Sequence, residues 1–198
     1  MFVITADQRG SRTNRDLVPA ALDDVERLIG DRLAAAAERT VGDEIQLATE
    51  DPAAALQIAL HLVREEYWSV GVGVGSFEEP LPRQVREARG EAFLHARTAV
   101  ERAKKSQERV AVESADAEAA GDAEALIRLL VELRDRRTAQ GWEVADLLGE
   151  GMTQKRAATV LGITPTAVSL RAKAASLRTE EAAIPALGRV LARLDGAA

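Results

Sequence analysis

Short apolar runs alternate with stretches of helical periodicity along the first part of the chain. Residues 2–6 (FVITA) are apolar and β-branched, which predicts a buried strand. Apolar residues then recur at helical spacing from Leu17 to Ala37, which predicts a helix of about five turns. Residues 38–49 place Gly42-Asp43 between β-branched residues, so we expect two short strands joined by a hairpin turn.

The same alternation continues to residue 113. Asp51-Pro52 supplies an N-cap and a first helical residue, and apolar spacing carries that helix to Val63. Residues 69–76 (SVGVGVGS) predict a strand with one face of small side chains. A loop at 79–83, a helix at about 84–105 and a strand at 109–113 follow. The order βαββαβαβ predicts an α+β domain: a ferredoxin-like sheet with an appended helix and strand.

The pattern changes after residue 113. Residues 114–124 lack large apolar side chains and are rich in Ala, Asp, Glu and Gly, which indicates a linker or a frayed helix start. Only helical periodicity follows, at 123–139, 142–148, 153–161, 165–175 and 180–194. We therefore expect an α+β domain at 1–113, a linker at 114–120 and an all-α domain at 121–198.

Residues 152–176 (MTQKRAATVLGITPTAVSLRAKAAS) predict two helices that cross at a tight turn. Small residues at Ala157 and Ala158 allow a close approach, and Gly162 can adopt the left-handed conformation at a helix end. Thr164-Pro165 then starts the second helix. The stretch resembles the helix-turn-helix of sigma-factor-like and other bacterial regulators, with Lys155 or Arg156 where that family often has an acid.

That resemblance implies a role for individual residues, because the second helix of the family enters the major groove of double-stranded DNA. The residues expected to face base edges are Thr164, Thr166, Ser169, Leu170 and Lys173. Those expected near phosphates are Gln154, Lys155 and Arg171. The alternative is an αα-hairpin of a helical bundle whose basic residues are simply solvated.

Composition restricts the chemistry, and charge at first argues against DNA. The chain has no Cys and two His, so thiol nucleophiles, disulfides and Cys-ligated zinc are excluded. The formal charge is −6, but residues 1–119 hold 15 bases and 22 acids, whereas residues 151–178 hold five bases and no acid. The acidity therefore belongs to the N-terminal part. No apolar run suits a signal peptide or a membrane span, so we expect a cytoplasmic protein with no membrane partner.

Two N-terminal segments resemble class III nucleotidyl cyclases and GGDEF-type domains: 2–12 (FVITADQRGSR) and 39–60 (RTVGDEIQLATEDPAAALQIAL). The resemblance implies that Asp7 and Asp43 occupy the positions of Mg²⁺-binding carboxylates. Arg97 can take the place of the family's charge-stabilising Arg, but Phe93 stands where the Asn is expected. The cyclase-like site is thus degenerate, and we do not expect an enzyme.

The chain as a whole resembles the SatD family. The motifs that carry this resemblance are Asp7 to Arg12 (DQRGSR), Gly42 to Gln46 (GDEIQ), Gly90 to Arg97 (GEAFLHAR) and the C-terminal helix pair. Membership would imply a DNA-binding regulator with a cyclase-like sensory or scaffolding domain.

One end of the predicted sheet gathers the candidate ligand-binding residues. They are Asp7, Gln8, Arg9, Ser11, Arg12, Asp43 and Gln46, with Arg97 added from the cyclase resemblance. One interpretation is a phosphate-containing ligand held by the Arg side chains and the Gly10-Ser11 backbone, with Mg²⁺ on Asp7 and Asp43. The other is that both Asp residues cap turns and the Arg residues neutralise them.

The last predicted helix carries an apolar stripe: Ile184, Leu187, Val190, Leu191 and Leu194. The stripe could pair with its copy in a homodimer, or it could close the bundle within one chain together with Leu126, Leu129, Leu130 and Leu133.

Taken together, we expect a DNA-binding transcriptional regulator controlled by a small phosphate-containing or nucleotide-like ligand. The alternative is a metal-dependent nucleotidyl cyclase or phosphotransferase whose tail targets it to DNA or a partner. A purely structural interaction module is the third possibility.

Overall fold

The computed structural model describes residues 1–11, 13, 15–82 and 84–196. Within them the chain forms an α+β fold with a five-stranded mixed sheet and eight α-helices. The strands are β1 Phe2–Gln8, β2 Leu33–Arg39, β3 Glu44–Thr49, β4 Trp68–Val74 and β5 Val110–Glu113. The helices are α1 Val18–Ile29, α2 Pro52–Arg64, α3 Glu91–Ala103, α4 Ala117–Asp135, α5 Ala139–Gly149, α6 Gln154–Leu161, α7 Pro165–Ala174 and α8 Leu177–Gly196. None of these helices combines the length and apolar character needed to cross a bilayer.

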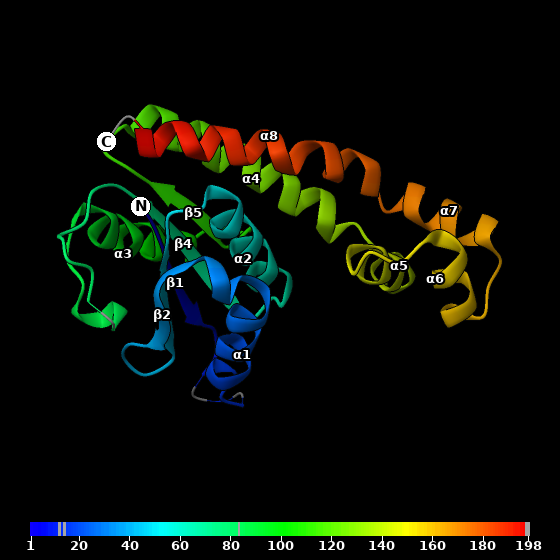
Figure 1. Cartoon of the computed structure of the whole chain (residues 1–198), viewed down its shortest axis with the longest axis horizontal. Helices are drawn as coiled ribbons and strands as arrows, with labels where there is room; N and C mark the ends of the chain where they lie inside the picture. Colours follow the sequence, from blue (N-terminus) through cyan, green and yellow to red (C-terminus); the bar gives the residue numbers. More distant parts are fainter. Residues whose placement is uncertain (12, 14, 83, 197–198) are drawn as a thin grey trace.

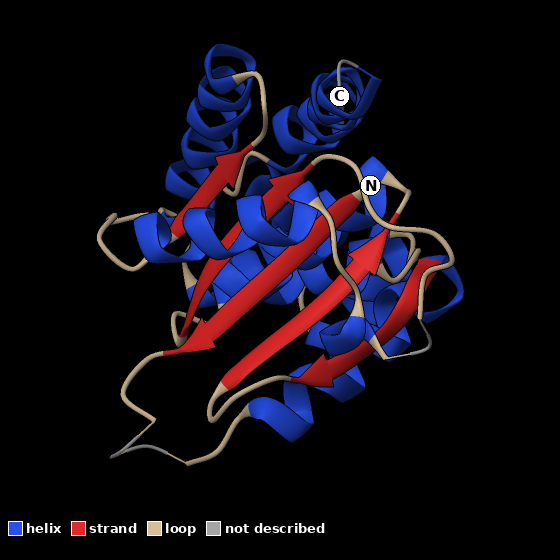
Figure 2. Ribbon diagram, turned by 90° about the vertical axis from the view of Figure 1, so that its left-hand side faces the viewer, coloured by secondary structure: helices blue, strands red, loops and turns tan. Residues whose placement is uncertain are grey.

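The strands lie in the order β2-β3-β1-β4-β5. All neighbours are antiparallel except β4 and β5, which are parallel and joined through α3. Helices α1, α2, α4 and α8 pack into one core with one face of the sheet, and α3 covers part of the other face (Figures 1 and 2).

The face of β4 toward α3 is made of glycine, as its alternating sequence predicts. An ideal Cβ at Gly73 would lie 2.1 Å from the backbone nitrogen of Ala96, and one at Gly71 would lie 2.2 Å from that of Val100. Such distances are far inside van der Waals contact, so α3 can approach the sheet only because these side chains are absent. The packing fixes the position of α3 against the strand.

The helix predicted from Leu17 to Ala37 is wrong in its second half. Helix α1 ends at Ile29, a 3₁₀ turn follows at Gly30–Arg32, and β2 contains the alanines at 34–37. Pairing with β3 supplies the backbone hydrogen bonds that a longer helix would have made, and Thr49 Oγ1 donates to the Arg32 carbonyl at 2.6 Å. Tertiary pairing has therefore overridden the helical propensity of alanine. The third predicted helix also starts later, at Glu91.

The expected linker at 114–120 is not a linker. Asp116 caps α4 by accepting from the Ala119 amide at 3.0 Å, and the helix begins at Ala117. Both α4 and α8 belong to the core formed with the sheet, through Ile127, Leu130 and Val131 of α4 and Leu187, Leu191 and Leu194 of α8. The boundary at 114–120 thus does not separate two cores. What stands apart from the sheet is the α5–α7 unit (residues 139–174), at the far end of α4 and α8 (Figure 1).

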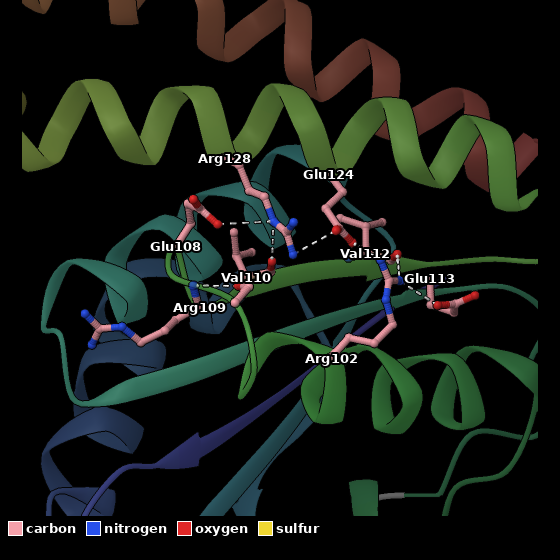
Figure 3. A network of polar contacts seen from close by, with 9 residues as sticks. Arg102, Glu108, Arg109, Val110, Val112, Glu113, Glu124 and Arg128 are labelled. Carbon is pink, nitrogen blue, oxygen red and sulfur yellow. Dashed lines mark hydrogen bonds and ion pairs between the residues drawn. The ribbon is translucent and has the colours of Figure 1, made fainter.

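Side chains of α4 fasten it to the edge of the sheet (Figure 3). The carboxylate of Glu124, which is 6% exposed, accepts from the Val112 amide at 2.9 Å and from Arg102 of α3 at 2.7 Å. Arg128 donates to the Val110 carbonyl at 3.1 Å and pairs with Glu124 at 2.8 Å. These groups occupy the free edge of β5, where another strand would otherwise pair.

Candidate nucleic-acid interface

Local capping defines the two helices of the predicted helix-turn-helix stretch. Thr153 accepts from the Arg156 amide at 3.3 Å and starts α6. Helix α6 ends at Gly162, which has a φ of 65°, a value that favours glycine. Thr164 Oγ1 then accepts from the Ala167 amide at 3.1 Å, and α7 begins at Pro165. The Thr164 cap and the turn at Gly162 lie where the sequence predicts them, whereas the cap at Thr153 was not predicted.

The α5–α7 unit has a small core of its own. Ala157, Ala158 and Val168 are buried together with Val144 of α5. Leu161 and Ile163 are partly buried against them, and the close approach expected at Ala157 and Ala158 is confirmed. The small Ala side chains bring α6 and α7 together, and α5 closes the third side.

Most of the residues expected to contact DNA are exposed on the outside of this unit. The exposed ones are Gln154, Lys155, Thr164, Thr166, Ser169, Leu170 and Lys173. Leu170 is 63% exposed. Arg171 differs, because it is half-buried and its Nη1 lies 3.4 Å from Glu143 Oε2 of α5.

A stack of arginines on Trp142 joins the α5–α7 unit to the rest of the molecule. The guanidinium of Arg64 lies 3.8 Å from the ring centroid, and those of Arg137 and Arg134 lie 4.7 and 5.5 Å away. Arg64, at the end of α2, also donates two hydrogen bonds to Asp146 of α5, at 2.6 and 2.8 Å. Burial lowers the pKa of Arg134 and of Arg137 to about 10, so both remain charged at neutral pH.

The Trp142 junction was only partly visible in the sequence. An isolated tryptophan among helical residues suggests an anchor, but Arg64 lies 78 positions earlier in the sequence. No local spacing relates two residues so far apart, so the contact emerges only in the folded chain.

The candidate ligand residues lie at the end of the sheet where β1 ends and β4 begins. Asp7 lies on the face of the sheet that α3 partly covers, and Lys104 Nζ lies 3.1 Å from its Oδ2. Partial burial would lower the pKa of Lys104, but hydrogen bonds to Glu101 and Asp7 outweigh that effect and raise it. Lys104 thus neutralises Asp7, a role that the sequence did not predict. Gln46 is on the same face, where its Nε2 donates to Thr5 Oγ1 at 3.1 Å.

Gln8 does not belong to a ligand site. Its side chain is buried on the other face, where Nε2 donates to the Arg15 carbonyl at 2.7 Å and Oε1 accepts from the Leu17 amide at 2.9 Å. Gln8 therefore holds the segment that leads into α1. The sequence prediction grouped Gln8 with Asp7 because the two residues are consecutive. In a strand, however, consecutive side chains point to opposite faces of the sheet.

The remaining candidates are spread around this end of the sheet. Arg9 Nη1 donates to the Glu66 carbonyl at 3.4 Å, and the Asp43 carbonyl accepts from the Gln8 amide at 3.1 Å. Ser11 is half-buried, Arg97 is exposed on α3, and Arg12 lies outside the described residues.

The Mg²⁺ site on Asp7 and Asp43 stays a prediction, because two carboxylates together with the phosphates of a ligand would be enough to hold the ion. The Asp7 carboxylate lies 3.1 Å from Lys104 Nζ. Among the described residues no group of three or more His, Cys, Asp or Glu side chains is placed to hold a metal ion.

The chain was also compared with known proteins. No protein-family model matches it, and searches of curated proteins and of solved structures found no match either.

Proposed function

We propose that the chain is a cytoplasmic DNA-binding transcriptional regulator whose α6 and α7 contact double-stranded DNA, with α7 in the major groove. The observation that carries the proposal is the outer face of α6 and α7, which is exposed, polar and basic. Residues 151–178 contain five bases and no acid. A single α-helix fits the width of the major groove, and a positive surface attracts the phosphates around it.

The outer face of α7 is suited to reading base edges. Thr166, Ser169 and Lys173 lie three to four residues apart, and Leu170 falls within the same stripe, so all four project from one side of the helix. Lys173 can donate to guanine O6 and N7, and Leu170 can contact a thymine methyl group. Thr164 keeps its hydroxyl hydrogen for donation, because its oxygen accepts the capping bond.

The exposure of Leu170 favours this function over a plain αα-hairpin. In a hairpin that only completes a bundle, an apolar residue of α7 would turn inward, as Val168 does. Single exposed leucines are common on protein surfaces, so Leu170 supports the proposal because it lies in the same stripe as Thr166, Ser169 and Lys173.

The sheet supports the rest of the proposal, a regulator of the SatD type with a small phosphate-containing or nucleotide-like effector. The strand order β4-β1-β3-β2 and the packing of α1 and α2 on one face support a ferredoxin-like sheet. An effector at Asp7 would contact Lys104, the residue that caps the C-terminus of α3. Arg102, two residues before Lys104, donates a hydrogen bond to Glu124 of α4. The effector site is therefore connected to α4 through the end of α3. The effector would change operator affinity only by binding one arrangement of these helices more tightly.

The test is genomic footprinting followed by a mobility shift on the strongest site. The Lys173→Ala variant should bind about 1–3 kcal/mol more weakly and discriminate less at the base that Lys173 contacts. Lys155→Ala, at a residue expected near phosphates, should reduce the slope of log K against log salt by about one. Lys105→Ala, which removes an exposed base far from α7, is the matched control and should bind as wild type. Binding that neither salt nor Lys173→Ala weakens would contradict the proposal.

An enzymatic function makes a different prediction. A nucleotidyl cyclase or phosphotransferase would turn over ATP or GTP with a divalent metal, and Asp43→Asn would abolish that turnover. We expect no turnover, because Lys104 already holds Asp7.

A further inference from the structure

An apolar groove lies between α4 and α8, on the side turned away from the sheet. Its volume is about 390 Å³. Leu126, Leu129 and Leu133 line one wall, and Ala183, Ala186 and Val190 line the other. Leu129 is 68% exposed and Leu126 is 44% exposed, so the rim of the groove is itself a ridge of leucines.

The α8 stripe is divided between two surfaces. Leu187, Leu191 and Leu194 are buried in the core of their own chain, so this part of the stripe closes the fold, whereas Val190 lines the groove. The surface left open is the groove beside it. We propose that a second copy of this chain docks in this groove, with α4 of one copy antiparallel to α4 of the other.

The shape of the surface favours a second copy as the occupant. Leu126, Leu129 and Leu133 follow the 3–4 spacing of a helix seam, and the small side chains of Ala183 and Ala186 form the opposite wall. Ridge and groove lie side by side on one surface. In a two-fold dimer the ridge of each copy can therefore fill the groove of the other, as self-complementary interfaces do.

Charge fixes the direction of the pairing. Asp122 lies seven residues before Leu129 and Arg136 lies seven residues after it, about 10.5 Å along the helix in each direction. All three share one face of α4, because seven residues make almost two full turns. An antiparallel pair centred on Leu129 brings Asp122 of each copy against Arg136 of its mate. A parallel pair would set Asp122 against Asp122 and Arg136 against Arg136.

The dimer would be a four-helix bundle of two α4 and two α8 helices. Its two-fold axis would place the α5–α7 units at opposite ends of the bundle. Two such units would match an operator with two-fold symmetry. Only this match to an operator rests on the proposed function, and the dimer itself does not.

The oligomeric state is measured first, by size-exclusion chromatography with light scattering at micromolar concentration and without DNA. Wild type should have twice the chain mass of 21.2 kDa. Leu129→Glu should be a monomer that still unfolds in one cooperative transition, because Leu129 is largely exposed within one chain, and its melting temperature should not depend on protein concentration. Leu94→Glu, at an equally exposed leucine of α3, is the control and should remain a dimer. A monomeric wild type, or a dimeric Leu129→Glu, would overturn the proposal.

Orientation is tested by cross-linking, since the chain has no cysteine of its own. Under mild oxidation Leu129→Cys should form a disulfide-linked dimer. Asp122→Cys and Arg136→Cys should each stay uncross-linked alone and cross-link when mixed. Cross-linking of each variant with itself, and not in the mixture, would overturn the antiparallel arrangement.

The charge pair is tested by reversal. Asp122→Arg should raise the dimer dissociation constant by about 3- to 30-fold, because two exposed ion pairs become repulsive. Adding Arg136→Asp should restore it, and failure of that rescue would contradict the pairing. All of these measurements are made without DNA. The dimer can therefore be confirmed even if the protein does not bind DNA, and DNA binding can be confirmed even if the protein is a monomer.

Discussion

Asp24 shows how one partly buried carboxylate joins two helices of the fold. It lies on α1, where its Oδ1 accepts from Arg27 at 2.6 Å and its Oδ2 lies 3.0 Å from His61 Nε2 of α2. Partial burial alone would raise the pKa of Asp24, but the hydrogen bonds with Arg27 and His61 outweigh it and hold that pKa below its ordinary value of 3.8. His61 thus lies at the boundary of the core, with a defined polar partner.

The lowered pKa predicts the pH dependence of the Asp24 contribution. Because the unfolded chain binds this proton more tightly, the contribution is fully present above about pH 4 and is lost as pH falls through the native pKa. Asp24→Asn should therefore lower the free energy of unfolding by about 0.5–1 kcal/mol at pH 7, and the deficit should shrink as the pH is lowered from 5 toward 3. Urea titrations at several pH values measure it.

The control for this prediction is Asp23→Asn, which removes an exposed carboxylate one position away. Its unfolding free energy should track wild type over the same pH range. A deficit for Asp24→Asn that grows below pH 4 would show that the carboxylate is not stabilised by its neighbours.

At the scale of elements, α5 is held by polar contacts and α3 by close backbone packing. The backbone of α3 packs directly on the glycines of β4. Helix α5 instead contacts the part of the molecule outside the α5–α7 unit through the side chains of Trp142 and Asp146. Their partners are Arg64, Arg134 and Arg137. Such contacts break at a smaller free-energy cost than a packed core. The junction is therefore the place where the α5–α7 unit can change its orientation.

Arg64→Ala tests this junction. The variant loses the closest cation–π contact with Trp142 and both hydrogen bonds to Asp146, together about 1–2 kcal/mol. Backbone hydrogen exchange in α5 should accelerate about tenfold, while exchange in β1 and β4 stays unchanged. Arg89→Ala, at an exposed arginine away from the junction, should leave α5 protected as in wild type. Unchanged exchange in α5 of Arg64→Ala would show that other contacts hold the unit.

At the scale of the whole molecule, the charged residues separate into an acidic part and a basic part, but the hydrophobic core does not follow the same boundary. The acidic residues concentrate in the part that contains the sheet, and residues 151–178, with five bases and no acid, lie at the far end of the long axis (Figure 1). The core does not follow this division, because α4 leads from the sheet to the basic end, α8 returns from it, and both helices pack on the sheet. The first residue even meets the last helix, through an ion pair between the amino terminus and Asp195.

The shared core predicts that residues 1–113 do not fold alone. Without α4 and α8 the sheet loses six buried aliphatic side chains, each worth about 1.5–3 kcal/mol, against a total stability of about 5–15 kcal/mol for ordinary domains. The fragment should show no cooperative thermal transition by circular dichroism, whereas residues 1–196 should. A fragment that melts like the full chain would restore the boundary at 114–120.

Local chemistry determined much of this protein from the sequence alone. The cap at Thr164, the left-handed Gly162 and the small-residue face of β4 are properties of a few consecutive residues, and each is found where the sequence predicts it. The tertiary structure decided the features that depend on residues far apart in the sequence. It made a strand of the alanines at 34–37, turned Gln8 away from Asp7, and placed Lys104 on Asp7 and Arg64 on Trp142. These outcomes depend on which distant surfaces meet, and the free energy of that meeting exceeds the local preference of any one segment.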